Sequence, residues 1–339
     1  MEQRRDDLTA SQYDSVKDDA QQLRILAGAG TGKTRVLTHR IAHQSQSLRI
    51  EPEHALCLTF TKKAANELRT RLERLGLSTS VTAGTFHALA YAQIKTRWED
   101  IGLNRPPSLL ESRRSLLRTT FSNNLPMESR ESICTEIDWA TARRLNPETY
   151  PEAAKKAQRN PSESSTQVSE YLHLFIQEKK KRNLIDFDDI LEYAIRYLAD
   201  DSNYAATRHW KYRYIFVDEF QDVNPLQFAL LRAWLGVDSS ICVVGDPDQA
   251  IYSWNGADAR YLQNFNDYFP NAKTVVLDDN FRSTPQIIAA ASAVLGVGSS
   301  LATTRPDGPF PSVRAATDCK AEARNISEKI NESRTYARN

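Results

Sequence analysis

A glycine-rich loop near the N-terminus, AGAGTGKT at residues 27–34, constrains the fold more than any other feature of the sequence. It follows the apolar run LRILA, which is typical of a buried strand, and it opens a segment with helical patterning. Glycines let the backbone curl so that successive N–H groups point at phosphate oxygens, and the following helix adds its dipole. This order predicts a nucleotide site, with Lys33 on the β- and γ-phosphates and the Thr34 hydroxyl on Mg²⁺.

One position departs from the general pattern of such loops, because Ala27 stands where glycine is usual. The alternative is a glycine-rich turn that carries a Lys–Thr pair by chance. The context of strand, loop and helix favours the nucleotide site. The residues predicted to bind ATP through this loop are Ala27, Gly28, Ala29, Gly30, Thr31, Gly32, Lys33, Thr34 and Arg35.

Four further apolar runs are each bounded by a turn or a polar cluster: ALCLTF (55–60), YIFV (214–217), ICVV (241–244) and TVVL (274–277). Apolar strands that alternate with helical patterns are typical of a parallel sheet covered on both faces. From about Phe86 to about Lys211 strand patterns are absent, and helical patterns rich in Arg and Lys are interrupted by prolines. The predicted fold class is therefore α/β, a P-loop parallel sheet interrupted by a mostly helical inserted subdomain.

Charge and cysteine content narrow the possible function classes. The 339 residues carry 44 Lys+Arg and 43 Asp+Glu, so a net charge of +1 excludes binding to a polyanion by bulk charge alone. A local basic groove remains compatible with binding to nucleic acid.

The scattered Cys57, Cys134, Cys242 and Cys319 predict neither disulfides nor a zinc site and favour a reducing compartment. Without a secretory signal or a membrane-length apolar stretch, we expect a cytoplasmic protein with no membrane contact.

Two polar segments follow predicted strands and complete the expected nucleotide chemistry. Asp218 at the end of YIFV is expected to hold Mg²⁺ together with Thr34, and Glu219 to position the attacking water as general base. An Asp–Glu pair after a strand is usually a solvated strand end, and the preceding phosphate loop makes the catalytic interpretation the stronger one. Gln249, after ICVV, is expected to sense the γ-phosphate, although in isolation its segment would be an ordinary acidic turn.

Six further segments, in fixed order, resemble the motifs of the UvrD/Rep family of superfamily 1 DNA helicases. They are LTFTKKAANELRTRL, GTFHALA, LIDFDDIL, VDEFQDVNPLQ, VVGDPDQAIYSWNGAD and DDNFRSTPQII. The resemblance implies a first RecA-like motor domain at residues 1–88 and 206–278, a helical insert at 89–205 and the beginning of a second RecA-like domain at 279–339. It also implies 3′-to-5′ movement along single-stranded DNA, driven by ATP with Mg²⁺, and strand separation at duplex junctions in DNA repair or recombination.

The resemblance assigns roles to further residues at the nucleotide. It implies that Gln12 reads the adenine edge, for which a side-chain amide offers both a donor and an acceptor. Phe281 stands where the family usually has tyrosine, and either ring is expected to stack on adenine. Arg282 matches the arginine that clamps the γ-phosphate, so the catalytic residues that we expect are Lys33, Asp218, Glu219, Gln249 and Arg282.

The resemblance also implies a surface that binds DNA by stacking aromatic side chains on its bases. Such stacking contributes about 1–3 kcal/mol per base and does not depend on the DNA sequence. Its expected residues are Thr59, Phe60, Thr61, Thr85, Phe86, His87, Tyr252 and Trp254. Hydroxyls and His87 would hold phosphates. For Phe60 and Phe86 the alternative is a core aromatic. Because Gln249 and Trp254 share one segment, we expect ATP binding to shift the stacked base.

Some features depart from the family or leave alternatives open. Asn255 stands where the family usually has arginine, and the family's later motifs are expected beyond Asn339. A nucleotide- and DNA-binding module without turnover, completed by a partner protein or a missing C-terminal half, is therefore the alternative function. A helicase–nuclease subunit is a third, although no nuclease carboxylate–lysine cluster is visible. For the basic run Glu178–Arg182, a solvated helix face is favoured over a DNA contact.

Overall fold

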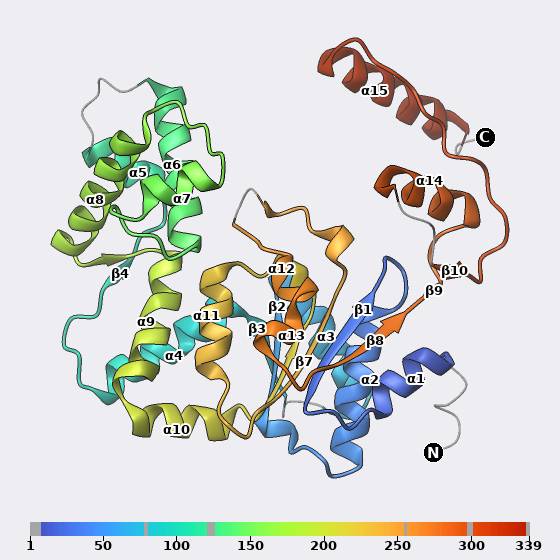
Figure 1. Cartoon of the computed structure of the whole chain (residues 1–339), viewed down its shortest axis with the longest axis horizontal. Coiled ribbons are helices and arrows are strands. Elements are labelled where there is room, and N and C mark those ends of the chain that lie inside the picture. Colours follow the sequence, from blue (N-terminus) through green and yellow to red (C-terminus); the bar gives the residue numbers. More distant parts are fainter. Residues whose placement is uncertain (1–7, 78–80, 121–125, 254–255, 297–300, 337–339) are drawn as a thin grey trace. The chain divides into compact units, whose positions relative to one another are not determined.

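The computed structural model describes residues 8–77, 81–120, 126–253, 256–296 and 301–336. The chain forms two compact units, Met1–Phe281 and Arg282–Asn339 (Figure 1). The first unit contains the phosphate loop and both predicted carboxylates, so the nucleotide chemistry expected from the sequence is concentrated there.

The first unit is built on a six-stranded parallel sheet with the strand order β3-β2-β6-β7-β1-β8. Its strands are β1 (Gln22–Ala27), β2 (Ala55–Thr59), β3 (Thr82–Thr85), β6 (Tyr214–Val217), β7 (Ser240–Gly245) and β8 (Lys273–Leu277). In the central register Leu23 of β1 lies opposite Cys242 of β7 and Lys273 of β8. The five apolar runs all form strands of this sheet, and the predicted α/β fold class is confirmed.

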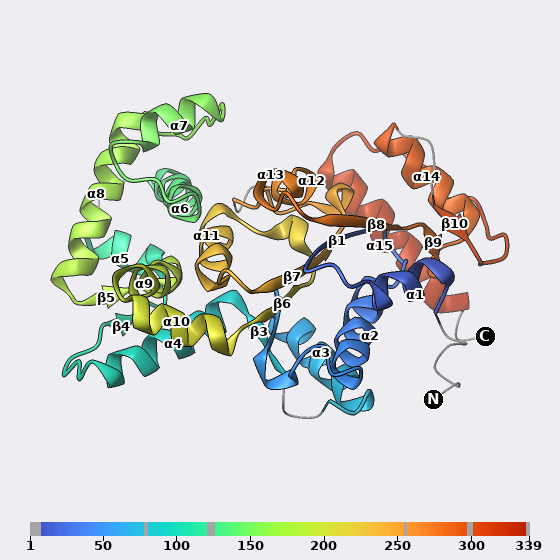
Figure 2. The same ribbon diagram turned by 60° about the horizontal axis from the view of Figure 1, so that its bottom comes forward.

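Alternate residues of the strands enter two separate cores, one on each face of the sheet. Ala55 and Cys57 pack with α2 (Lys33–Gln46) and α3 (Lys62–Arg74). Leu56 and Leu58 pack on the other face, and Figure 2 shows α2 and α3 opposite α11. The helices that contribute to or cover these cores also include α1 (Ala10–Lys17), α4 (Phe86–Asp100), α9 (Phe187–Asp200), α10 (Ser202–Lys211), α11 (Pro225–Trp234), α12 (Arg260–Gln263) and α13 (Phe265–Tyr268). Burial on both faces explains why these strands are uniformly apolar.

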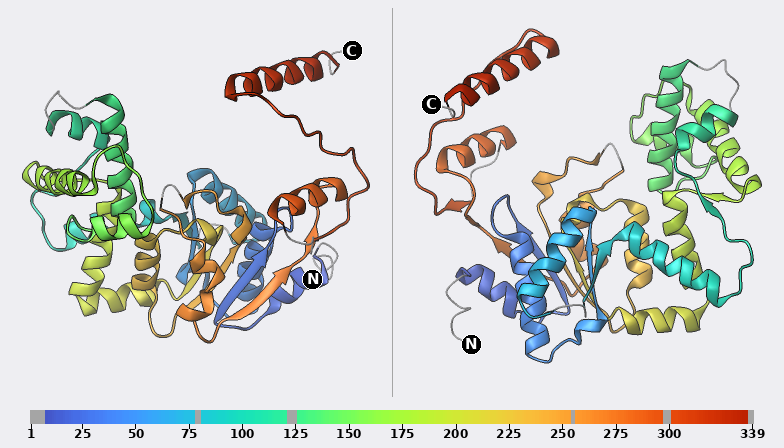
Figure 3. Two further views of the ribbon diagram at one scale, coloured as in Figure 1. Left: turned by 45° about the horizontal axis from the view of Figure 1, so that its top comes forward. Right: turned by 180° about the vertical axis from the view of Figure 1, so that it is seen from behind.

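The segment between β3 and β6 is the predicted helical insert, drawn in cyan to yellow-green in Figure 3. Its own core joins α5 (Arg113–Thr120), α6 (Met127–Ala142), α7 (Tyr150–Lys156) and α8 (Ser165–Lys181). The segment is mostly helical, as predicted, and it also holds one pair of short strands that no sequence pattern indicated: β4 (Ser108–Leu109) pairs in parallel with β5 (Leu184–Ile185). Each of these strands has only two residues, which is too short for a recognisable apolar pattern.

Lys179 corrects the interpretation of the basic run as a solvated face. It lies in the last turn of α8 with only 6% of its surface exposed. Its ammonium donates to Asp186 Oδ2 at 2.7 Å and to Asp189 Oδ2 at 2.6 Å. These partners follow seven and ten residues later, beyond a turn, which a helical charge pattern does not reveal.

The second unit contains α14 (Pro285–Leu295), β10 (Ala302–Thr303) and α15 (Cys319–Tyr336), while β9 (Asp279–Asn280) closes the first. The four cysteines are free thiols, of which Cys57, Cys134 and Cys242 are buried and Cys319 is exposed. In the part of the chain that the structure describes, no helix is long and apolar enough to cross a membrane. The ranges predicted for separate domains stay predictions.

Candidate functional site

The phosphate loop links β1 to α2 through backbone conformations that favour glycine. Gly30 and Gly32 have φ values of +76° and +88°, in the left-handed region where side chains are strained. The loop is fastened by Thr31 Oγ1, which donates to the Gly28 carbonyl at 2.9 Å, and by Phe281 N–H, which donates to the Gly30 carbonyl at 3.0 Å. Asn280 Nδ2 donates to the Ala29 carbonyl. The chain's own hydrogen bonds therefore fix the conformation of the loop.

Gln12 lies against this loop. Its side chain is 3% exposed, and its Nε2 donates to the Thr31 carbonyl at 2.8 Å. Its Oε1 accepts from the Thr9 N–H at 3.2 Å in the capping box that begins α1. A Cβ on Gly32, whose φ of +88° already disfavours other residues, would come within 2.9 Å of Gln12 Nε2 and would displace the Gln12 amide. Its predicted role in reading adenine stays a prediction.

Both residues predicted to hold Mg²⁺ meet at the carboxyl end of the sheet. Thr34 Oγ1 donates to Asp218 Oδ2 at 2.9 Å, and Asp218 Oδ1 accepts from the Glu219 N–H at 3.0 Å. Burial and the neighbouring Glu219 raise the pKa of Asp218 to about 6. The described residues contain no cluster of three or more His, Cys, Asp or Glu that could hold a metal alone. One hydroxyl and one carboxylate are suitable protein ligands for Mg²⁺, because this ion usually takes its remaining ligands from water and from nucleotide phosphates.

Lys33 and Glu219 complete this edge of the site. Lys33 is 8% exposed, and its ammonium lies 3.6 Å from Glu219 Oε2, beyond hydrogen-bond distance. Glu219 has a φ of +52°, which is strained for a residue other than glycine. A buried cation held loosely beside a strained carboxylate is suited to receive the phosphates of a ligand.

Gln249 reaches the same edge from the end of β7, in the short 3₁₀ helix Pro247–Gln249. Its Nε2 donates to Asp246 Oδ2 at 2.5 Å. Between Gln249 and Glu219 lies Gln221, a buried residue that the sequence analysis missed. The signal that could have found it is an amide side chain set between the acidic residues of VDEFQD, immediately after a buried strand.

Phe281 and Arg282 stand at the junction of the two units. Phe281 ends the first unit and is 38% exposed, and Arg282 is an exposed residue that begins the second. Their predicted roles at the adenine and the γ-phosphate stay predictions. Arg35, in the first turn of α2, is half-buried, and its contact with ATP also stays a prediction.

The threonines and the aromatic residues predicted to contact DNA at the ends of β2 and β3 differ in their surroundings. The threonines take part in local hydrogen bonds. Thr61 and Thr85 act as N-caps, accepting from the Ala64 and Ala88 N–H groups at 3.0 and 3.2 Å. Thr59 is 2% exposed, and its hydroxyl donates to the Thr61 carbonyl.

Phe86 belongs to the core. It is 1% exposed, and its ring stacks on Trp234 with the centroids 6.2 Å apart. The half-buried Phe60 packs against it at 6.0 Å. The structure therefore agrees with the core alternative for Phe86, since no base reaches this ring without opening the core. Phe60 stays a prediction.

Other aromatic residues near the predicted DNA surface are more exposed than Phe86. His87 is half-buried, and its ring meets Phe187 edge to face with the centroids 5.9 Å apart. Phe187, in the LIDFDDIL segment, is 53% exposed and was not predicted as a site residue. Burial lowers the pKa of His87 although Asp188 opposes the shift, which favours the neutral imidazole. Tyr252 is 45% exposed, whereas Trp254 and Asn255 lie outside the described residues.

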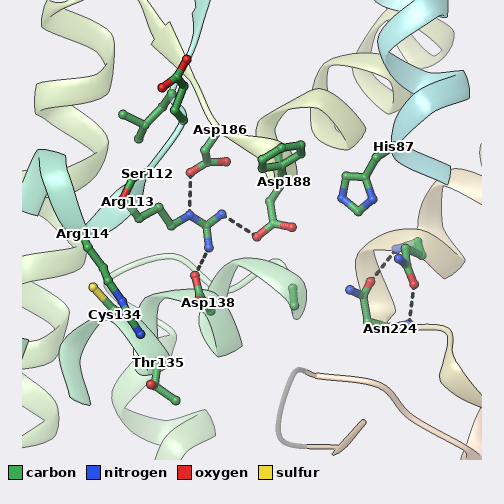
Figure 4. A pocket seen from close by; sticks show the side chains of 15 residues that line it. His87, Ser112, Arg113, Arg114, Cys134, Thr135, Asp138, Asp186, Asp188 and Asn224 are labelled. Atoms are coloured by element: carbon green, nitrogen blue, oxygen red, sulfur yellow. Dashed lines mark hydrogen bonds and ion pairs between the residues drawn. The ribbon is translucent and has the colours of Figure 1, made fainter. Parts of the chain in front are cut away.

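His87 and Phe187 also line a pocket of about 450 Å³ between the insert and the sheet domain (Figure 4). At its wall Arg113 donates to Asp186 at 3.1 Å and to Asp188 at 2.7 Å, and it also pairs with Asp138. We call Arg113, Asp138, Lys179, Asp186, Asp188 and Asp189 the insert cluster. Burial alone would raise the pKa of Asp186, but Arg113 and Lys179 outweigh it and hold that pKa well below its usual range.

Comparison with known proteins agrees with this geometry. Residues 8–270 match the UvrD/REP helicase N-terminal domain. The ATP-dependent DNA helicase UvrD2 of Mycobacterium tuberculosis is 36% identical over 327 residues, which cover 90% of this chain and 47% of that protein. The ATP-dependent DNA helicases PcrA of Leuconostoc citreum and Staphylococcus epidermidis are 35% and 32% identical, covering 84% and 85% of this chain and 38% and 40% of those proteins.

The chain thus spans less than half the length of the curated relatives it matches. The family match extends over most of the first compact unit, from before the phosphate loop to the residues that precede β8. Together with the parallel sheet and the polar residues gathered at its carboxyl edge, the match shows that the chain belongs to the UvrD/Rep helicase family.

Proposed function

We propose that the chain is the ATP-binding portion of a DNA helicase that moves 3′ to 5′ along single-stranded DNA and separates strands at duplex junctions. The observation that carries the proposal is the convergence of Lys33, Thr34, Asp218 and Glu219 beside the phosphate loop. Its cellular setting would be DNA repair or recombination in the cytoplasm. Residues 1–88 and 206–278 would form the first motor domain, 89–205 its insert and 279–339 the beginning of the second motor domain. The six strands of the sheet fall within the first pair of ranges.

In this proposal each residue acts on the bound nucleotide in a definite place. The loop N–H groups and Lys33 hold the phosphates, and Thr34 with Asp218 would hold Mg²⁺, which neutralises charge developing on the phosphates. Glu219 orients the attacking water, because its carboxylate lies at the same strand end as Asp218. Gln249 would detect the γ-phosphate, and Arg282 would stabilise the transferred phosphoryl group.

DNA would lie along the exposed aromatic side chains of the first unit. Tyr252 and Phe187 expose enough ring surface for a base to stack, and His87 contacts Phe187. A neutral His87 would hold a phosphate or a base edge by hydrogen bonding rather than by charge. Stacking without base-specific contacts would allow the motor to act on any sequence.

Hydrolysis of ATP by the chain, measured with and without single-stranded DNA, tests the proposal. We expect DNA-stimulated turnover that falls at least about 100-fold in Lys33→Met, because the cation at the transferred phosphate is lost. Lys95→Met, which changes an exposed lysine of α4, serves as the matched control and should retain activity. ATP binding without turnover would instead favour a nucleotide- and DNA-binding module that needs another chain or segment. Failure to bind ATP would refute both.

A further inference from the structure

Gln221 is a buried amide that joins two strand ends of the nucleotide site. It is 2% exposed and lies in the 3₁₀ helix Phe220–Asp222, just after β6. Its Nε2 donates to Glu219 Oε2 at 2.9 Å, and its Oε1 accepts from the Asp246 N–H at 3.0 Å. Asp246 follows β7, so one side chain connects the predicted general base to the neighbouring strand.

The connection continues to the predicted γ-phosphate sensor. The carboxylate of Asp246, whose N–H contacts Gln221, accepts from Gln249 Nε2 at 2.5 Å. On the other side Glu219 Oε2, which accepts from Gln221, lies 3.6 Å from the Lys33 ammonium. A hydrogen-bonded polar chain therefore runs from Glu219 through Gln221 and Asp246 to Gln249, and its Glu219 end lies 3.6 Å from Lys33 beside the phosphate loop.

Only one amide orientation satisfies both partners of Gln221. A carboxylate accepts hydrogen bonds and a backbone N–H donates them, so the NH₂ group must face Glu219 and the carbonyl must face Asp246. A flipped amide would oppose acceptor to acceptor and donor to donor. An ionised glutamate or an apolar side chain in this place would lose at least one of the two bonds.

The backbone around Gln221 leaves room for this arrangement and little else. A Cβ on Gly245 would come within 2.5 Å of Gln221 Oε1 and 2.8 Å of Leu262 Cδ2. Glu219, two residues before Gln221, has the strained φ of +52°. A strained residue keeps one conformation only when its surroundings fix it. The hydrogen bond from Gln221 supplies such a restraint on the Glu219 carboxylate itself.

We propose that Gln221 is a positioning residue that fixes the Glu219 carboxylate relative to the Gln249 segment, so that orienting the water and detecting the γ-phosphate are mechanically linked. The inference rests on the proposed ATP hydrolysis at this site. Gln221 does not touch the nucleotide in this scheme. Its loss therefore impairs the chemical step, because a misplacement of about 1 Å costs about 100-fold in rate, and leaves ATP affinity unaffected.

Kinetics of two Gln221 variants test the proposal. In Gln221→Met we expect the Kd for MgATP to stay within about twofold while kcat falls about 10-fold or more. Gln221→Glu retains an acceptor for the Asp246 N–H and replaces only the donor to Glu219, so it should lose kcat as well. A general loss of structure would raise the Kd as it lowers kcat, whereas lost positioning lowers kcat at an unaltered Kd, even if the loss of two buried hydrogen bonds lowers the melting temperature.

Gln93→Met is the matched control. Gln93 is 3% exposed and has two side-chain hydrogen bonds of its own, one to the Ala194 carbonyl and one from Trp234 Nε1. It lies in α4 and contributes nothing to the polar chain at the nucleotide site. We expect its kcat to equal that of the unaltered chain, even if its melting temperature falls.

Hydrogen exchange gives a second readout that does not need turnover. A non-hydrolysable ATP analogue with Mg²⁺ should slow exchange of the Asp246 amide in the unaltered chain, and this response should be lost in Gln221→Met. Gln221→Glu with unaltered kcat, or Gln221→Met with an unaltered exchange response, would overturn the role of Gln221 and leave the proposed function intact. Absence of ATP binding by the unaltered chain would overturn both.

Discussion

Two buried groups of charges in the first unit differ in how completely they are paired. In the insert cluster Arg113 pairs with Asp138, Asp186 and Asp188, and Lys179 pairs with two of the neighbouring carboxylates. At the nucleotide edge the Lys33 ammonium only approaches one carboxylate, at 3.6 Å. Lys33, Arg113, Lys179 and Asp186 are all largely buried, yet the cations of the insert cluster have close partners whereas the ion pair of Lys33 with the partly exposed Glu219 is loose.

The pKa values follow this difference. Asp186 stays ionised because its cations outweigh the effect of burial, whereas the pKa of Asp218 rises to about 6 because burial and Glu219 disfavour its charge. Unpaired buried charge is costly to a folded chain unless a ligand compensates it. We infer that the insert cluster joins helices together, and that the nucleotide edge keeps charge available for phosphates and Mg²⁺.

The largest effect on stability should come from Arg113→Met. It would leave three carboxylates without their shared cation, and removal of one partner of a buried ion pair costs about 3–5 kcal/mol. Urea unfolding would measure the loss. Lys33→Met, the corresponding change at the nucleotide edge, should alter the free energy of unfolding by less than about 1 kcal/mol because Lys33 has no close ion pair. Equal losses in the two variants would contradict the comparison.

A smaller effect of opposite sign is expected from Asp222→Asn. Burial and Glu219 raise the pKa of Asp222 to about 6, and its Oδ1 has no hydrogen-bond partner among the described residues. Because this pKa lies above the unfolded value of 3.8, the group's contribution to stability is full below pH 3.8 and is lost as the pH rises through 6. Partial exposure reduces the effect, so the variant should be about 1 kcal/mol more stable at pH 7.5.

Urea unfolding at several pH values checks this prediction. The advantage of Asp222→Asn should shrink on acidification and vanish near pH 4, where the unaltered chain also carries a protonated carboxyl. Asp238→Asn, at an exposed aspartate, provides the control and should show no such trend. A variant that is less stable than the unaltered chain at pH 7.5 would show that Asp222 is stabilised by its surroundings.

The smallest effect is expected for an exposed ion pair beside the insert cluster. Arg144 contacts Glu192 through two bonds, at 2.6 and 3.1 Å, and both side chains are about 40% exposed. Glu192→Gln should reduce the free energy of unfolding by about 0.5 kcal/mol or less, because exposed pairs are screened by water and salt. A loss comparable to that of Arg113→Met would show that burial does not decide the strength of these pairs.

The fold was predictable where apolar strands carried their own pattern. All five apolar runs form strands. The strand β3 has no such apolar run, because Ala83 and Gly84 leave space for Leu89 of α4. A Cβ on Gly84 would meet Leu89 Cγ at 3.0 Å. The order of the strands and the β4–β5 pair could not be predicted, since they depend on contacts between segments far apart in the chain.

The candidate site was predictable where residue type and local position agreed. Lys33, Thr34, Asp218 and Glu219 follow predicted strands, and parallel strands bring their carboxyl ends to one edge. Gln221 was missed because the importance of an amide depends on its two partners, one of them on another strand. Phe86 shows the opposite case: its burial and its contact with Trp234 favour the core alternative, and neither can be read from a local motif.

The position of β1 in the sheet has a consequence for the order in which the chain is synthesised. β1 and the phosphate loop are made early, but the strands that flank β1 are β7 and β8, which emerge only after the whole insert. At about 5–20 residues per second, an unpaired apolar strand would wait on the order of ten seconds or more for its neighbours. During this interval the nascent chain exposes a strand edge, so its yield in a cell should depend on chaperones more than its final stability suggests.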